Sequence, residues 1–419
     1  MKLFRSAIFW CHLAAGLVSG ISIGIMCFTG TALAYEKQLV AWAERDVRRV
    51  TPPGAGATRF TIAQLQAKLR EAQPEARPMS IIVQNDPGAA VAFTSGGRGG
   101  GGAFYVNPYT GEVRAAQPTA MRGFMQTMTA WHRTLGFTGE TTRPRGKLIT
   151  GVCNLAFCIL ALTGLYLWMP RTWSWRGVKA IALFNGRLAG KARDFNWHNA
   201  IGLWSAPFLI VLTLTAIPMS FQWGTRAINS LTGTPQPVIG RSGPGGAAAL
   251  PAMEVPAPPP GARPLDPDAL LAVVQRQIPR WETITINPGR GGAGATPAIA
   301  GESTPRTAAP RATPTALIAP AATFTVRSRD SWPRTANSTL ALNPYTGAVL
   351  GRTGYADLPA AQQVRSWTRF LHTGEALGFW GQLIAGLACL GGCFLVYTGF
   401  ALSWRRFFGQ RPAPPSTAA

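Results

Sequence analysis

Four histidines carry the clearest chemical signal in this chain of 419 residues, and they form two matching pairs. His12 and His198 each begin the pattern His-x-x-x-Gly-Leu, while His132 and His372 each precede a long apolar stretch. A neutral imidazole is a common axial ligand of haem iron, and two imidazoles on different helices can fill both axial positions of a b-type haem. The pattern therefore predicts two haem sites, one held by His12 and His198 and one by His132 and His372.

Two other interpretations of these histidines stay open at this level. Histidines near a membrane surface can simply satisfy backbone carbonyls or lipid headgroups. A zinc or copper centre is the other possibility, although zinc usually takes three or four ligands at one place. The like positions within each pair favour haem. Arg133, next to His132, is a candidate partner for haem propionates, and further candidates are Arg369, Arg143, Arg145 and Lys147.

The elements that must position the histidines are four stretches without Asp, Glu, Lys or Arg. They cover residues 6–35, 148–170, 195–225 and 376–404, and each is long enough to span a bilayer, which needs about 20 apolar residues. The first stretch is longer than the apolar region of a signal peptide, roughly 7–15 residues, so we expect an uncleaved helix. Ionisable groups at membrane depth are costly and usually functional.

The distribution of charge predicts which ends of these helices face the cytoplasm. With a cytoplasmic N-terminus, the cytoplasmic segments are residues 1–5, 171–194 and 405–419. Their only acid is Asp194, and their basic residues are Lys2, Arg5, Arg171, Arg176, Lys179, Arg187, Lys191, Arg193, Arg405, Arg406 and Arg411. This is the positive-inside bias of short membrane loops. It places His12 and His198 near the cytoplasmic face and the other pair near the opposite face.

The two halves of the chain repeat one another, which points to a duplicated module. Asn-Pro-Tyr-Thr-Gly occurs at residues 107–111 and again at 343–347, and Thr163-Gly164 in the second apolar stretch matches Thr398-Gly399 in the fourth. Short apolar runs beside each pentapeptide predict strands, and a helical pattern precedes them at 61–71 and at 266–277. We therefore expect two membrane helices and one α+β domain in each repeat.

The expected order of segments follows from these patterns. It is a first membrane helix at 1–35, an outer domain with the His132 segment at 36–146, a second helix at 147–170, a basic cytoplasmic loop at 171–194, a third helix at 195–225, a second outer domain with the His372 segment at 226–375, a fourth helix at 376–404 and a cytoplasmic tail at 405–419. The Gly- and Pro-rich tracts at 96–102, 233–264 and 288–320 are interpreted as flexible insertions, because their composition cannot bury a core.

Composition and motifs exclude several other classes of protein. The net charge of +23 does not indicate nucleic-acid binding, because the basic residues are spread over loops and tails with no base-reading motif. All six cysteines lie in the charge-free stretches, so the water-exposed segments have no disulfide framework. Walker loops, nucleophile elbows and dinucleotide fingerprints are missing. Any electron donor must therefore be another molecule.

The chain resembles the PepSY-associated transmembrane family of iron-regulated membrane proteins, which includes inner-membrane siderophore reductases. The resemblance covers nearly the whole chain apart from the insertions and the tail. It rests on both pentapeptide turns and on the segments Trp10-Cys11-His12, Trp131-His132-Arg133, Trp197-His198 and Leu371-His372. It implies an α-helical integral membrane protein of the bacterial inner membrane, with a four-helix core, two periplasmic PepSY-like domains and two b haems.

The resemblance also implies an activity, the reduction of ferric siderophore in the periplasm. Electrons would come from a quinol or a cytoplasmic reductase, and Fe(III) would become Fe(II). The long insertion in the second domain departs from the family pattern, so no substrate-contact residues are assigned. One alternative is a non-redox PepSY module, anchored in the membrane, that binds and regulates peptidases. A transporter is a weaker alternative, because no span carries an obvious charged substrate site.

Overall fold

The protein, described here from a computed structural model, is divided into two compact units. Described residues are 2–54, 56–94, 102–116, 119–170, 173–235, 255, 262–287 and 321–409. A helical unit takes residues 1–40, 120–245 and 360–419, and a sheet unit takes residues 41–119 and 246–359. Each unit therefore draws on both repeats. The insertions predicted at 96–102, 233–264 and 288–320 lie largely outside the described residues.

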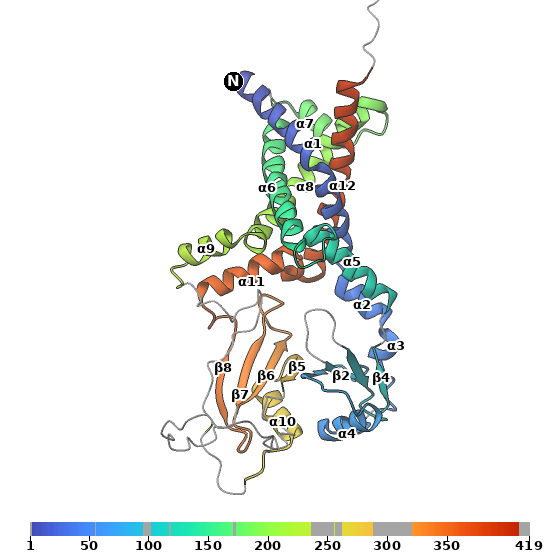
Figure 1. Cartoon of the computed structure of the whole chain (residues 1–419), viewed down its shortest axis with the longest axis vertical. Coiled ribbons are helices and arrows are strands. Elements are labelled where there is room, and N and C mark those ends of the chain that lie inside the picture. The colour runs from blue at the N-terminus through green and yellow to red at the C-terminus, as the bar shows by residue number, and fades with distance from the viewer. Residues whose placement is uncertain are drawn as a thin grey trace, which may run out of the picture. The chain divides into compact units, whose positions relative to one another are not determined.

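Four long helices form the core of the helical unit. They are α1 (Lys2–Leu33), α6 (Arg143–Trp168), α8 (Gly190–Ser220) and α12 (Gly378–Phe407). All four are long and apolar enough to cross a membrane, and each contains most of one of the charge-free stretches. The helices α1 and α8 each pack against both α6 and α12, and Figure 1 shows the bundle that results.

The long helices differ in detail from the charge-free stretches. Helix α6 begins at Arg143 rather than at residue 147, and α8 begins at Gly190 rather than at residue 195. Absence of charge marks only the apolar part of a span, and basic residues commonly extend it at the interface. Close approach of α1 and α12 depends on glycine, since a Cβ at Gly20 would lie 2.8 Å from the Phe400 ring. Small residues serve this purpose where helices associate in lipid.

Two amphipathic helices, α5 (Ala120–Thr134) and α11 (Ala360–His372), lie across one end of the bundle (Figure 1). Helix α5 packs against α1 and α6, and α11 packs against α8 and α9 (Gln222–Leu231). The sequence placed His132 and His372, the outer histidines, in segments before the second and fourth spans. The structure puts each of them on a helix of its own, separate from the span that follows. These helices end because Leu135, Gly136 and Gly374 adopt φ values of 51°, 80° and 74°.

Shorter helical segments complete the chain trace. They are α2 (Glu36–Ala43), α3 (Arg45–Arg48), α4 (Ile62–Ala72), α7 (Trp175–Ala182), α10 (Pro267–Gln277) and the 3-10 helix η1 (Glu375–Leu377). Helices α4 and α10 match the helical patterns predicted at 61–71 and 266–277. Their first turns are capped, since the side chain of Thr61 accepts a hydrogen bond from Gln64 N–H and that of Asp266 accepts one from Asp268 N–H.

The sheet unit contains one antiparallel sheet of eight strands, in the order β4-β3-β2-β1-β5-β6-β7-β8. The strands are β1 (Ser80–Gln84), β2 (Val91–Thr94), β3 (Ala103–Val106), β4 (Val113–Ala115), β5 (Trp281–Asn287), β6 (Ala322–Ser328), β7 (Ser338–Leu342) and β8 (Val349–Thr353). Strands β1 and β5 pair at the centre, with Ile82 opposite Thr285. Both repeats place their strands in the same order outward from that pair.

This central pairing changes the expected domain organisation. The sequence predicted one α+β domain in each repeat, but the two sets of strands share one sheet and one apolar core. The core joins Leu65 of α4 and Phe93 of β2 to Val274 of α10 and Phe324 of β6. A four-stranded sheet alone would expose β1 or β5 as an unpaired edge, and pairing satisfies those backbone groups.

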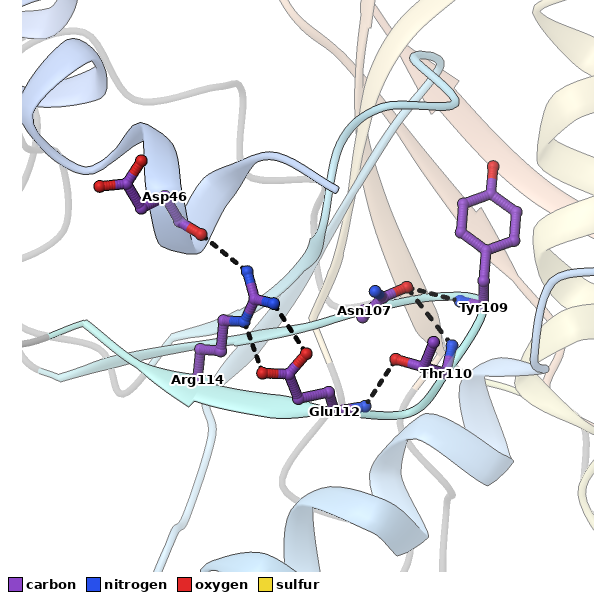
Figure 2. A network of polar contacts seen from close by, with 6 residues as sticks. All are labelled: Asp46, Asn107, Tyr109, Thr110, Glu112 and Arg114. Carbon is purple, nitrogen blue, oxygen red and sulfur yellow. Dashed lines mark hydrogen bonds and ion pairs between the residues drawn. The ribbon is translucent and has the colours of Figure 1, made fainter. Parts of the chain in front are cut away.

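The first copy of the repeated pentapeptide forms a hydrogen-bonded turn between β3 and β4. The Asn107 Oδ1 accepts hydrogen bonds from the N–H groups of Tyr109 (2.9 Å) and Thr110 (3.4 Å), and the Thr110 Oγ1 accepts one from Glu112 N–H (3.3 Å; Figure 2). Gly111 has a φ of 73°, a conformation that glycine adopts without steric cost. The Tyr109 hydroxyl donates a further hydrogen bond to the backbone oxygen of Pro87 at 3.0 Å.

The second copy of the pentapeptide forms the same turn between β7 and β8. The Asn343 Oδ1 accepts from the N–H groups of Tyr345 (2.9 Å) and Thr346 (3.2 Å), and Gly347 again has a φ of 73°. The duplication therefore preserves the backbone geometry of a hairpin. We interpret both copies as structural.

The first turn carries an ion pair that the second lacks. The Arg114 guanidinium lies 2.7 Å from the Glu112 carboxylate and donates a hydrogen bond to the backbone oxygen of Asp46 at 2.8 Å (Figure 2). The matching positions of the second repeat are Ala348 and Leu350. The two repeats therefore share their turn and differ in the contacts around it.

Candidate functional site

The structure brings His12 on α1 and His198 on α8 to one cavity inside the four-helix bundle. This cavity has a volume of about 720 Å³, within the range of about 300–1,000 Å³ typical of cofactor pockets. All four long helices contribute to its walls. Its apolar lining includes Gly16 and Gly20 of α1, Phe157 and Leu160 of α6, Ala206 and Leu209 of α8, and Val396 and Phe400 of α12.

His12 and His198, the inner histidines, are each held by a threonine from the neighbouring helix. The His12 Nδ1 lies 2.8 Å from the Thr163 Oγ1, and the His198 Nδ1 lies 2.8 Å from the Thr398 Oγ1. Each threonine hydroxyl also donates a hydrogen bond at 2.7 Å to a backbone oxygen of its own helix. With its proton used in that way, the hydroxyl must accept from the Nδ1–H of the imidazole. The Nε2 lone pair of each ring is then free to bind a metal.

The outer histidines face one another across the ends of α5 and α11. The ring centroids of His132 and His372 lie 6.1 Å apart, with an angle of 53° between the ring planes. The His132 Nδ1 is 3.0 Å from the backbone oxygen of Met26, and the His372 Nδ1 is 2.9 Å from that of Leu212. Both rings therefore donate Nδ1–H to a backbone oxygen, which again leaves Nε2 available.

The repeats place these backbone acceptors at equivalent points. Met26 follows His12 by 14 residues, and Leu212 follows His198 by 14 residues. At 1.5 Å per residue, this separation is about 21 Å along a helix. Two sites of two histidines therefore stand at different depths of the same bundle, and each site takes one ligand from each repeat.

The geometry of the outer pair fits two axial ligands of one metal ion. Two imidazoles that bind one ion through Nε2 on opposite sides place their centroids about 6.3 Å apart, for metal–nitrogen bonds of about 2.0 Å, close to the 6.1 Å observed. Metal-bound imidazoles almost always donate the other ring N–H to a fixed partner, as all four rings do here. Zinc usually takes three or four ligands at one place, and among the described residues no group of three or more His, Cys, Asp or Glu side chains could hold a metal ion.

Glycines leave room next to three of the four rings. A Cβ at Gly164 would lie 3.4 Å from the Cε1 of His12, and one at Gly399 would lie 3.7 Å from that of His198. At the outer site, a Cβ at Gly30 would lie 3.3 Å from the Cε1 of His132. Only Gly30 is in a tight place, because its Cβ would also lie 3.1 Å from the Cys389 Sγ, whereas a Cβ at Gly164 or Gly399 would make an ordinary contact with the ring.

Three cations line the inner cavity, and sequence reasoning missed them as site residues. Arg5 donates hydrogen bonds to the backbone oxygens of Leu167 (2.6 Å) and Met169 (3.1 Å), and Arg406 lies 4.9 Å from the ring centroids of both Phe9 and Trp10. The third cation is Lys191 on the first turn of α8. Carboxylate groups of a ligand in this cavity would meet these cations. The sequence signal was present, since all three sit at span ends, but it was attributed to topology alone.

The outer pair lies in an environment that keeps both imidazoles neutral. Burial is the main cause that lowers the pKa of His132 to about 4, and the nearby His372 and Arg133 also lower it. Burial and Arg133 lower the pKa of His372 as well. Neutral imidazole is the form that binds a metal.

The cations predicted around the outer pair lie on the elements that carry or adjoin it. Arg133 follows His132 on α5 and is exposed, and Arg369 on α11 lies 5.7 Å from the Phe370 ring centroid. Arg143, Arg145 and Lys147 are exposed on the first turns of α6. Of these five, Arg133 affects both rings electrostatically.

The fold and the paired histidines define a multi-pass helical membrane protein with two candidate metal-binding sites inside its bundle. The chain belongs to the family described as PepSY-associated TM region, whose sequence model matches residues 9–406. This match covers nearly the whole chain and confirms the family resemblance drawn from the histidine segments. No curated protein matches the chain.

Proposed function

We propose that this chain is a membrane electron-transfer protein with two b haems, and that it reduces ferric siderophore for iron release. The observation that supports this most strongly is that four histidines, paired at two depths, all have Nδ1 hydrogen-bonded and Nε2 available. His12 and His198 hold the inner haem in this proposal, and His132 and His372 hold the outer one. When bound, each haem supplies a one-electron couple between ferric and ferrous iron.

The chain's own residues have defined roles in this proposal. Thr163 and Thr398 fix the tautomer and the orientation of the inner imidazoles, and the backbone oxygens of Met26 and Leu212 do so for the outer ones. Hydrogen-bond partners of this kind raise the basicity of the imidazole that they hold. The cavity wall is mostly apolar, while Arg5, Lys191 and Arg406 provide positive charge for carboxylates.

The acceptor is the part of the proposal that rests on the family resemblance. Siderophores hold iron through hard oxygen ligands, which suit Fe(III) better than Fe(II). One electron per iron would therefore weaken the complex and release the metal. The positive-inside bias supports an orientation in the bacterial inner membrane that puts the outer histidines and the sheet unit on the periplasmic side.

An absorption spectrum of the detergent-purified protein tests the proposal directly. We expect two low-spin b haems per chain, measured as pyridine haemochrome, with both reduced by dithionite. Mixing the reduced protein with a ferric siderophore, in the presence of a ferrous-iron chelator, should then reoxidise the haems and give the coloured ferrous complex. Haem-free protein from haem-replete cells would contradict the proposal and favour a peptidase-regulating PepSY module. Haems that stay reduced beside ferric siderophore would contradict only the acceptor.

A further inference from the structure

The bundle end that carries the start of α1 and the end of α12 has a surface of one charge sign. Its exposed cations are Arg176, Lys179, Arg187, Lys191, Arg405 and Arg406. Among the described residues of segments 2–5, 173–194 and 405–409, the one acid is Asp194, which is fully buried. Arg193 and Arg405 lie 2.8 Å and 3.1 Å from its carboxylate oxygens. No exposed carboxylate therefore offsets the surface cations in this part of the described chain.

Helix α7, which carries Arg176 and Lys179, is fixed to the helix that carries His198. The Asn196 Nδ2 donates hydrogen bonds to the backbone oxygens of Ala180 (2.9 Å) and Leu183 (3.0 Å). The Trp204 Nε1 donates another to the oxygen of Ala182 at 2.9 Å. The α7 cations are therefore held in place by α8, the helix of the inner ligand.

The same end of the bundle holds the cations of the inner cavity. Arg5, Lys191 and Arg406 come from three different helices and line the cavity of His12 and His198. Attraction to lipid headgroups requires only that cations lie near the membrane surface. Cations that line this cavity, on a face whose three described segments carry one acid and bury it, fit an anionic surface that approaches the cavity.

We propose that this face docks an acidic protein that donates single electrons to the inner site. This inference rests on the proposed function and names its electron donor by class. One electron leaves the donor and enters the site of His12 and His198, and no bond forms or breaks. Complementary charge accelerates such encounters by about 10- to 1,000-fold, and salt removes the effect.

Stopped-flow reduction of the haem-loaded protein tests the docking surface. The protein is placed in nanodiscs of neutral phosphatidylcholine, which expose both faces, and is mixed with reduced flavodoxin, an acidic one-electron donor. Raising salt from about 0.01 M to about 1 M shortens the Debye length from about 30 Å to about 3 Å. We expect the second-order rate constant to fall by about 10- to 1,000-fold. Reduction by duroquinol, an uncharged donor, should not change with salt.

Removing positive charge from α7 tests whether this helix is part of the docking surface. The double variant Arg176→Gln/Lys179→Gln should slow reduction by flavodoxin severalfold at low salt and should flatten the salt dependence. Arg226→Gln on α9, at the other end of the bundle, is the matched control and should change neither. Surface plasmon resonance can measure the binding of oxidised flavodoxin to the nanodiscs without any electron transfer. The affinity should fall for the α7 double variant and should stay unchanged for Arg226→Gln.

The outcomes separate the two proposals. One outcome would overturn the docking surface alone. In it, the protein contains haem and is reduced by duroquinol, but its binding and its reduction by flavodoxin do not depend on salt. An α7 double variant that keeps the flavodoxin kinetics and salt dependence of the unchanged protein would likewise overturn the docking surface. Failure of the proposed function would appear earlier, as the absence of haem from the spectrum.

Discussion

The two repeats hold their inner histidines identically and their outer histidines differently. At the inner site, each imidazole meets a threonine of the neighbouring helix at 2.8 Å. At the outer site, His132 meets both the backbone oxygen of Met26 and the Thr29 Oγ1 (3.1 Å), whereas His372 meets the backbone oxygen of Leu212. The inner imidazoles are therefore held by two side chains. The outer imidazoles are held mainly by backbone oxygens, which a substitution cannot remove. We expect the inner site to be the more sensitive to substitution around its ligands.

Loss of a ligand should have the largest effect. His198→Ala should remove the inner haem and His372→Ala the outer one, so each variant should fall from two haems to one per chain by pyridine haemochrome. The remaining haem reports that the protein is folded. A variant that keeps both haems, or loses both, would break the assignment of one histidine pair to each site.

Loss of the inner threonine anchors should come next. Thr163→Val and Thr398→Val keep the shape of the side chain and remove the acceptor for Nδ1–H. Loss of such a partner typically costs about 10- to 100-fold in affinity, and haem titration of the apoprotein should show this loss equally for both variants. Unequal losses would show that the symmetry of the inner site is geometric but not energetic.

Substitution at the outer site should sharpen the contrast between the repeats. Thr29→Val removes one of two acceptors at His132 and leaves the Met26 oxygen, so its effect on haem affinity should be smaller than that of Thr163→Val. Thr215→Val is the matched control in the second repeat, because the Thr215 hydroxyl bonds to the backbone oxygen of Val211. A loss for Thr29→Val as large as that for Thr163→Val would contradict the distinction between side-chain and backbone anchoring.

The smallest effect is expected in the sheet unit, where the first repeat alone has the pair of Glu112 and Arg114. The hydrogen bond from Arg114 lowers the pKa of Glu112 from its ordinary value of 4.5. Because the folded pKa is the lower one, the pair's stabilisation is complete above about pH 4.5 and is lost as the pH falls through the folded pKa. Thermal unfolding should therefore show a small loss for Glu112→Gln at neutral pH that disappears in acid. A loss for Glu112→Gln that persists unchanged in acid would contradict this role of the pair.

Much of the fold could be predicted from local sequence. The four long apolar helices followed from absence of charge, the strands next to the Asn-Pro-Tyr-Thr-Gly turns followed from apolar runs, and α4 and α10 followed from a helical pattern, whereas β2 and β6 were not predicted. The pairing of β1 with β5 could not be predicted, because residues such as Ile82 and Thr285 meet across about half of the chain. Local patterns indicate that a strand exists but do not specify its neighbour.

The candidate site, like the fold, could be predicted only in part from the sequence. The histidines were visible as a repeated residue type, and Thr163-Gly164 and Thr398-Gly399 were visible as a repeat without a role. Their role required the distance to a histidine on another helix. The Met26 and Leu212 anchors left no signal at all, because a backbone oxygen is the same for every residue type. Arg5 and Arg406 come from opposite ends of the chain, and only folding places both at one cavity.

The division of each histidine pair between repeats has a consequence for the ancestry of the molecule. A chain of half this length would carry one ligand for each site and an unpaired β1 strand, so alone it could complete neither site nor sheet. Two such chains related by a two-fold axis would complete both, because a two-fold interface brings each patch to its own copy. The two halves of the present chain are therefore related to one another as the two chains of such a homodimer would be. Because both halves lie in one chain, matching positions need not be identical, as Glu112 and Ala348 show.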